Sequence, residues 1–103
     1  MDPRTRLIDL ILRKSYREGD FTLSSGAKSS FYIDLKATTL SAEGARLIGE
    51  LAIADLRHAG ILDRTEGVGG LTLGADPIAT TVSLASLGCS NSPEGIPAFL
   101  VRK

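Results

Sequence analysis

The chain has 103 residues, of which 43% are apolar and 23% are charged, and its 12 basic side chains balance its 12 acidic ones. A chain of this length forms one small domain and has no room for a second. No stretch approaches the roughly 18 consecutive apolar residues of a membrane helix. The zero net charge creates no overall field that would attract nucleic acid or acidic lipid. We therefore predict neither a nucleic-acid nor a membrane partner, and a phosphate site would have to be local.

The chain has a single cysteine, Cys89, and its N-terminus lacks the apolar core of a signal peptide. A lone cysteine cannot close an intramolecular disulfide. Both observations predict a protein of the reducing cytoplasm.

The first predicted helix begins at Pro3, because Asp2 is a good N-cap residue and proline fits the first helical position. The apolar residues that recur at helical spacing are Leu7, Ile8, Ile11, Leu12 and Tyr16. The basic residues of the expected last turn are Arg13, Lys14 and Arg17. Such residues complement the negative end of the helix dipole, and Gly19 supplies a left-handed stop.

Two short strands are predicted next, at 21–23 and 31–33, joined by a turn rich in serine and glycine. Tyr32 alternates with Phe31 and Ile33, so at least one face of the second strand is expected to be core. Stacking of Tyr32 on a planar base is the alternative. The turn offers hydroxyls and the cation of Lys28, which could grip a carboxylate or phosphate, although solvated turns have the same composition.

Ser41 caps a second predicted helix, which runs through Leu56 and ends near Gly60. Ile61 and Leu62 are expected to fold back against it. His58, the only histidine, lies in the last turn and has no nucleophile beside it. We therefore interpret it as a helix-end residue. No cluster of cysteine and histidine suggests zinc, and no complete catalytic constellation is present.

A glycine-rich segment, 66–70, is a poor strand by propensity, but its glycines suit close approach to a ligand or to a neighbouring element. Asp76 and Pro77 repeat the N-cap and first-turn signature, and the third helix is expected to continue to Gly88. The loop 67–77 therefore joins a strand to a helix N-terminus, which could receive a phosphate. The alternative is a tight turn that packs the helix on the strand.

The final predicted strand covers 98–101, and Arg102 and Lys103 follow it. The order of elements predicts an α/β fold with a parallel sheet. Ligands bind beyond the carboxyl ends of strands in such sheets, so the two basic residues are candidates for phosphate contact; a frayed terminus is the alternative. Two parallel strands alone leave much sheet surface open, so more chain or a partner is expected.

Three segments together, 21–34, 67–79 and 99–103, resemble the orotate phosphoribosyltransferase family in their motifs, order and spacing. The resemblance implies an incomplete type I phosphoribosyltransferase fold, with a parallel sheet, flanking helices and a small N-terminal hood. Residues 1–103 would form a single partial domain, with the hood at about 1–40 and the start of the core sheet at about 41–103. The implied reaction is Mg²⁺-dependent, and it converts orotate and 5-phosphoribosyl 1-diphosphate into orotidine 5'-monophosphate and diphosphate in UMP biosynthesis.

The resemblance also implies roles for individual residues. Backbone around Tyr32 and Ile33 would face orotate. Arg102 and Lys103 would begin a mobile loop that holds the diphosphate, partly across a homodimer interface. Some family members carry a lysine where this chain has Ser24, and Lys28 is a candidate to replace it. Some also carry Tyr-Lys where this chain has Thr-Leu at 72–73.

The family's remaining loop residues and its acidic-pair ribose-phosphate motif lie beyond the position of Lys103. The resemblance therefore implies an N-terminal half, and we expect the isolated 103-residue chain to be inactive. Two alternatives stay open: a non-catalytic short module for phosphate or orotate binding or for dimerisation, and an unrelated small phosphate-binding domain.

Overall fold

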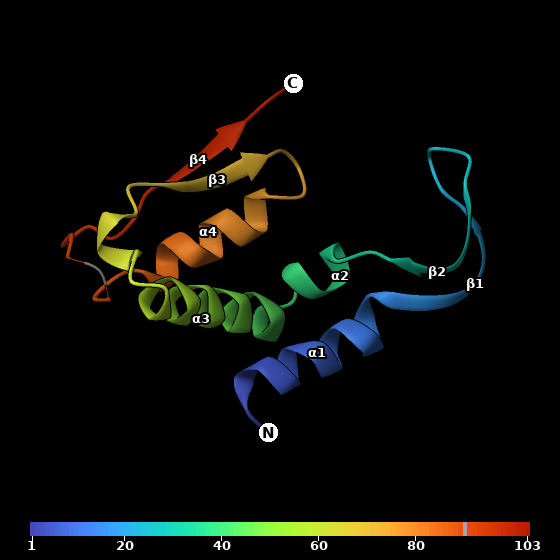
Figure 1. The fold of residues 1–103 in the computed structure, drawn as a ribbon, viewed down its shortest axis with the longest axis horizontal. Coiled ribbons are helices and arrows are strands. Elements are labelled where there is room, and N and C mark those ends of the chain that lie inside the picture. The colour runs from blue at the N-terminus through green and yellow to red at the C-terminus, as the bar shows by residue number, and fades with distance from the viewer. Residues whose placement is uncertain (90) are drawn as a thin grey trace.

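The computed structural model describes residues 1–89 and 91–103 and contains two small sheets linked by helices (Figure 1). The helices are α1 (Pro3–Lys14), α2 (Lys36–Thr39), α3 (Ala42–His58), a 3₁₀ turn (Leu62–Arg64) and α4 (Asp76–Ala85). The strands are β1 (Tyr16–Thr22), β2 (Lys28–Ile33), β3 (Val68–Leu71) and β4 (Ala98–Val101). Within the described residues, none of these helices has both the length and the apolarity needed to span a membrane.

Helix α1 begins as predicted, because the Asp2 carboxylate accepts the Thr5 amide at 3.0 Å. It ends earlier than predicted, at Lys14. Arg17 and Gly19 belong to β1, so their assignment to a last turn and a helix stop was wrong. The chain leaves the helix because Ser15 is buried, where its hydroxyl shares a hydrogen bond of 2.7 Å with that of Thr38, and the following residues pair with β2.

Strands β1 and β2 form the predicted hairpin, although both strands are longer than expected. Their pairing is antiparallel, with an irregularity between Glu18 and Phe21. The expectation that one face of β2 is core was wrong, since Tyr32 is 45% exposed and its neighbours in β2 are similarly exposed. The aromatic rings pair with rings of β1 on each face of the hairpin, and this local stacking replaces a core.

Helix α3 begins at its predicted cap, where the Ser41 hydroxyl accepts the Gly44 amide at 3.1 Å. The short helix α2 before it had not been predicted. A Cβ on Gly44 would overlap the carbonyl oxygen of Thr38, so glycine allows α3 to start against the end of α2.

The core lies between α3, α4 and the segment that precedes β4. Its buried cluster consists of Ile53, Leu62, Val82 and Ile96. Leu62 folds back against α3 as expected. The predicted continuation of α4 to Gly88 was wrong, because the helix ends at Ala85, and Leu87 lies beyond it and is exposed. Gly49 brings the two helices close, since a Cβ there would lie 2.7 Å from the Thr81 carbonyl oxygen.

Strands β3 and β4 confirm the predicted parallel sheet, with Val68 opposite Ala98 and Leu71 opposite Val101. Helix α4 packs on this sheet from one side (Figure 1). The sheet is poorly covered, since Leu71, Phe99 and Leu100 are each about half exposed. The fold is therefore mixed α/β, with the open sheet surface that the sequence predicted.

Two ion pairs attach α1 to α3. The Arg6 guanidinium binds the Glu43 carboxylate in a forked arrangement, at 2.7 and 2.8 Å, and Arg4 binds Asp55 at 2.8 Å. The hydrogen bond and charge of Glu43 raise the pKa of Arg6, and the hydrogen bond from Arg6 lowers the pKa of Glu43. The forked pair joins two helices through residues that are 37 positions apart in the sequence.

We expect the Arg6–Glu43 pair to make stability depend on acid pH. Because the folded pKa of Glu43 lies below the ordinary pKa of glutamate, the pair stabilises the fold fully above that ordinary pKa, and this stabilisation is lost as pH falls through the lower folded pKa. Replacing Glu43→Gln should therefore lower the melting temperature at pH 7, and the difference from wild type should disappear in strong acid. Thermal unfolding followed by circular dichroism measures both.

The matched control is Glu50→Gln, whose partner Arg46 lies on the same helix at 3.2 Å. It should have a smaller effect at pH 7, because its pair joins no second element. An equal melting temperature for wild type and Glu43→Gln at pH 7 would contradict the role given to the pair.

Candidate functional site

The carboxyl ends of β3 and β4 lie at the same sheet edge, because Leu71 pairs with Val101. The Thr72 amide extends this pairing and donates to the Val101 carbonyl oxygen at 3.0 Å. The loop at 72–75 leads from this edge into α4, and Arg102 continues from β4 at the same edge (Figure 1). The structure therefore brings the predicted glycine loop and the predicted basic pair to one edge of the sheet.

The glycines of β3 allow β4 to approach closely. A Cβ on Gly69 would overlap the carbonyl oxygen of Phe99, and one on Gly67 would lie 3.2 Å from the Phe99 ring. A Cβ on Gly70 would lie 2.7 Å from the Ala75 Cβ. Of the two explanations offered by the sequence, contact with a neighbouring element accounts for these three glycines. Gly74 is different, because nothing lies within 4 Å of a Cβ built on it.

The prediction that Asp76 is the N-cap of α4 was wrong. Ala75 occupies the cap position, without a side-chain cap bond, and Asp76 is the first helical residue. One Asp76 carboxylate oxygen is buried and has no hydrogen-bond partner in the described part of the chain. The peptide bond between Thr72 and Leu73 is cis.

The loop keeps amide groups available at this helix end. Ala75 and Asp76 donate to the carbonyl oxygens of Leu71 and Leu73, at 3.1 and 3.3 Å. No acceptor is recorded among residues 1–89 and 91–103 for the amides of Leu73 and the exposed Gly74. Free amides at a helix N-terminus are suited to bind an oxyanion.

Arg102 and Lys103 are exposed, and neither forms an ion pair within the described residues. Their guanidinium and ammonium groups are therefore available to an anion at the sheet edge. The arrangement of free amides and two cations could hold a phosphate or diphosphate. It contains no nucleophile paired with a base.

The other predicted site residues lie on the hairpin, which is a separate sheet. In β2, Tyr32 lies opposite Arg17 and Ile33 lies opposite Tyr16. The Lys28 ammonium donates to the Thr22 hydroxyl at 3.0 Å, so it is held across the hairpin. Figure 1 shows α2 between the hairpin and the β3–β4 sheet, so the structure does not gather these residues at the sheet edge.

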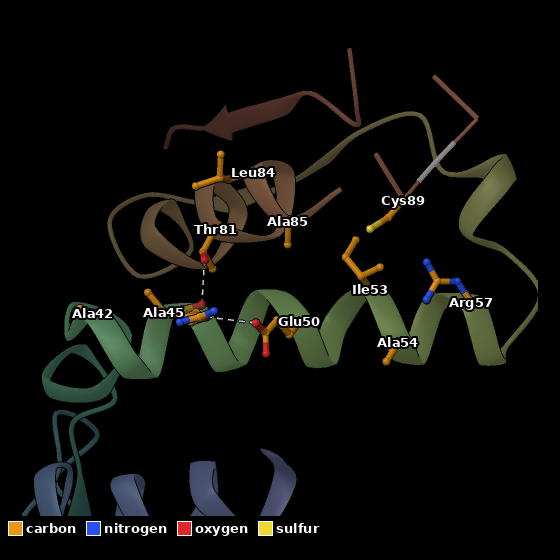
Figure 2. Close-up of a pocket in the computed structure, with 11 residues that line it drawn as sticks. Ala42, Ala45, Glu50, Ile53, Ala54, Arg57, Thr81, Leu84, Ala85 and Cys89 are labelled. Carbon is orange, nitrogen blue, oxygen red and sulfur yellow. Dashed lines mark hydrogen bonds and ion pairs between the residues drawn. The ribbon is translucent and has the colours of Figure 1, made fainter. Parts of the chain in front are cut away.

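A groove of about 550 Å³ lies between α3 and α4 (Figure 2). Its walls are mainly apolar, and they include Ile53, Ala54 and Leu84. The Thr81 hydroxyl in its wall donates to the Ala45 carbonyl oxygen at 2.7 Å. Across the described chain, no three His, Cys, Asp or Glu residues gather as metal ligands. The groove is therefore mainly apolar, although Arg46, Glu50, Arg57 and Cys89 also line it.

A second hollow, of about 300 Å³, lies beside the hairpin and had not been predicted. Its lining residues are Lys14, Ser15, Arg17, Phe21, Thr22, Tyr32, Asp34 and Ala37. Helical spacing had predicted Lys14 and Arg17 in one helix turn. Extending the predicted strand back from Phe21 to Tyr16 would have placed Arg17 opposite Tyr32.

Comparison with known proteins gives a consistent relationship. The chain is 49% identical over 102 residues to an orotate phosphoribosyltransferase of Thermosynechococcus vestitus, covering 99% of this chain and 50% of the relative. It is 47% identical over 100 residues to one of Nostoc sp., covering 97% of this chain and 45% of the relative. The chain thus spans about half the length of these curated relatives. No family model matches it.

A solved structure also matches. It is the Mycobacterium tuberculosis H37Rv orotate phosphoribosyltransferase in complex with 5-phospho-alpha-D-ribosyl 1-diphosphate, with a TM-score of 0.71 and 38% identity. The match covers 99% of this chain and 54% of that protein. Sequence and fold therefore point to the same family, over about half of its length.

We expect Gly69→Ala to destabilise the sheet edge, since its Cβ would overlap Phe99. Overpacking of this kind costs about 1–3 kcal/mol. Gly74→Ala is the matched control, because its Cβ meets open space, and its effect should stay within about 0.5 kcal/mol. Urea unfolding of both variants measures the difference. Equal stability of the two variants would show that β4 does not require glycine at position 69.

Proposed function

We propose that this chain, a relative of the orotate phosphoribosyltransferases along nearly its whole length, supplies about half of an enzyme with that activity. The reaction transfers phosphoribosyl from 5-phosphoribosyl 1-diphosphate to orotate, and it releases diphosphate and orotidine 5'-monophosphate, in UMP biosynthesis. The observation that carries the proposal is the sheet edge, where the free amides of the glycine loop lie beside the strand that leads into Arg102 and Lys103.

The proposed role of this edge is to gather charge on the leaving group. Departure of diphosphate leaves an oxocarbenium-like ribose, so groups that stabilise the negative charge of diphosphate lower the barrier. Arg102 would bind the diphosphate oxygens through its fork, and Lys103 would act as a compact charge. The amides of Leu73 and Gly74 would bind one phosphate at the N-terminus of α4.

Magnesium belongs to the proposal only as an ion that accompanies the diphosphate. Mg²⁺ in proteins is commonly bound by one or two carboxylates, substrate phosphates and water. Within the described residues no metal cage exists, and the buried Asp76 oxygen is not accessible. The residues of this chain do not fit a resident ion, so we derive no step through it.

The hairpin is proposed to serve the base side of the reaction. Tyr32 and Ile33 are half exposed on β2, so their backbone is accessible to orotate. Lys28 remains a candidate only if it releases the Thr22 hydroxyl. The proposal also includes a homodimer, a cytoplasmic location, and a division of the chain near residue 40 into a hood and a core sheet.

The alternative of a non-catalytic binding module is not favoured, because the relatives matched along the whole chain are named as enzymes. An unrelated phosphate-binding domain is disfavoured for the same reason. The enzymatic proposal also accounts for the open sheet, which needs further strands or a partner.

The isolated 103-residue chain is expected to show no turnover, because one sheet edge with two cations cannot enclose both substrates. Loss of orotate absorbance in the presence of 5-phosphoribosyl 1-diphosphate and Mg²⁺ measures this. Turnover above the buffer background by the purified chain would contradict the expectation.

A chimera tests the proposed activity directly. We would replace the matching half of the Thermosynechococcus vestitus relative with this chain and measure orotidine 5'-monophosphate formation. The chimera should be active, and Arg102→Ala or Lys103→Ala should each lower kcat/KM by about 100-fold, the typical loss for one charge-stabilising donor.

The matched control is Arg64→Ala, an exposed arginine in the 3₁₀ turn after α3 that forms no ion pair in the described chain. It should leave kcat/KM within about twofold, as expected for a surface substitution. A folded chimera without activity, or equal losses for Arg64→Ala and Arg102→Ala, would refute the proposed function of the edge.

A further inference from the structure

The side chains of the β3–β4 sheet do little to fix its register. The centre of β3 consists of Gly69 and Gly70, and every residue of β4 is exposed, on both faces of the sheet. A buried face specifies register strongly, whereas a glycine-rich strand specifies it weakly. A slip of two residues would keep the faces of β4 and move its end by about 6.6 Å along the sheet. The register therefore needs support from contacts outside the two strands.

The end of α4 holds the chain just before β4 through two serine hydroxyls. The Ser86 hydroxyl accepts the Ile96 amide at 2.7 Å, and the Ser83 hydroxyl donates to the Ile96 carbonyl oxygen at 2.6 Å. The Ser86 hydroxyl also donates to the Ser83 carbonyl oxygen at 2.6 Å, so its own proton has a partner. Both backbone polar groups of Ile96 are thus bound by the side chains of one helix end. We call Ser83 and Ser86 the serine clamp.

The serine clamp lies against the core. Ser86 is 0% exposed and Ile96 is 2% exposed, and the Ile96 side chain belongs to the buried cluster that includes Val82. Glycine is needed at position 95, where a Cβ would lie 2.7 Å from the Ser86 Oγ. Removing the Ser86 hydroxyl would leave a buried amide without its partner, which is costly. The core therefore holds Ile96 by its side chain and by its backbone.

The hydrogen bonds of the sheet begin directly after the clamped residue. Pro97 follows Ile96, and its carbonyl oxygen accepts the Val68 amide at 3.0 Å. Proline also restricts the residue before it to extended conformations, so the backbone of Ile96 has little freedom to absorb a slip. The pairing then continues without a shift to Leu71 opposite Val101. The position of Ile96 therefore determines where the chain leaves β4.

We propose that Ser83 and Ser86 are positioning residues for the diphosphate side of the reaction. By setting the register of β4, they place Arg102 and Lys103 beside the glycine loop. The clamp lies at the C-terminal end of α4 and the loop at its N-terminal end, about 15 Å away for a helix of this length (Figure 1). The serines therefore act through β4. This inference rests on the proposed function, because the two cations hold diphosphate only in that enzyme.

The first test measures the register in the 103-residue chain, without turnover. The Thr72 amide reports the end of the ladder, since it donates to the Val101 carbonyl oxygen. The Ile53 amide, in the middle of α3, reports the core. In Ser86→Ala, hydrogen exchange at Thr72 relative to Ile53 should become about tenfold faster than in wild type. Ser83→Ala, at a partly buried position, should act in the same direction and serves if Ser86→Ala does not fold.

The matched control is Thr81→Val, which removes a hydroxyl from the same helix. The Thr81 hydroxyl donates to the Ala45 carbonyl oxygen of α3 at 2.7 Å, so this bond does not reach β4. The control should leave the exchange ratio unchanged, and Ser83→Thr, which keeps the hydroxyl, should restore the wild-type ratio. An unchanged ratio in Ser83→Ala, or an equal rise in Thr81→Val, would overturn the proposal.

A second measurement uses the active chimera. Ser83→Ala should raise the KM for 5-phosphoribosyl 1-diphosphate about tenfold, as expected when binding groups are misplaced by an ångström or more. The KM for orotate should stay unchanged, and Ser83→Thr should restore both constants. Equal changes in the two constants would indicate a general structural role and refute the assignment, as would no change in either.

The two proposals fail in distinguishable ways. An inactive chimera would refute the proposed enzyme activity, whereas a faster Thr72 exchange in the clamp variants would still support control of the register by the serines. An active chimera whose clamp variants keep the wild-type exchange ratio would refute the clamp and leave the enzyme activity supported.

Discussion

The parallel, in-register pairing of β3 with β4 is the constraint on which the candidate site depends. It requires glycine at position 69, where a Cβ would overlap the Phe99 carbonyl oxygen. It also makes the two strands end together at Leu71 and Val101. The loop after β3 and the chain after β4 therefore begin side by side, because the pairing of the two strands places the start of both segments. Free amides and cations meet there because the strand register brings them together.

Much of this could be predicted from the sequence, because local rules control it. The caps at Asp2 and Ser41 use side-chain oxygens within three residues of the amides that they bind. The strand order and the open sheet followed from alternating patterns. The end of α1 could not be read in this way, because it depends on burial of Ser15 against Thr38, 23 residues away. Arg17 has the helical spacing of a last-turn residue, but it pairs with Tyr32 of β2 and therefore belongs to a strand.

In the candidate site, too, features set by neighbouring residues could be predicted, whereas features that depend on residues far apart in the sequence could not. Arg102 and Lys103 could be predicted as candidates because the end of the final strand is visible in the sequence. The hollow beside the hairpin was missed because its residues come from the end of α1, both strands and α2. Asp76 was misread because a good capping residue lay one position inside the helix. A capping signature identifies the neighbourhood of a helix start, whereas the backbone geometry decides which residue occupies the cap.

The free outer edges of the β3–β4 sheet have a kinetic consequence. Within the described chain, this sheet contains two strands, so each has one edge without a strand partner. The α3–α4 core closes within one molecule, and its formation is a first-order process. Pairing of sheet edges between molecules is second-order, and it is favoured by half-exposed apolar side chains such as Phe99. Dilution therefore slows association between molecules without slowing core formation, so protein concentration decides which process is faster.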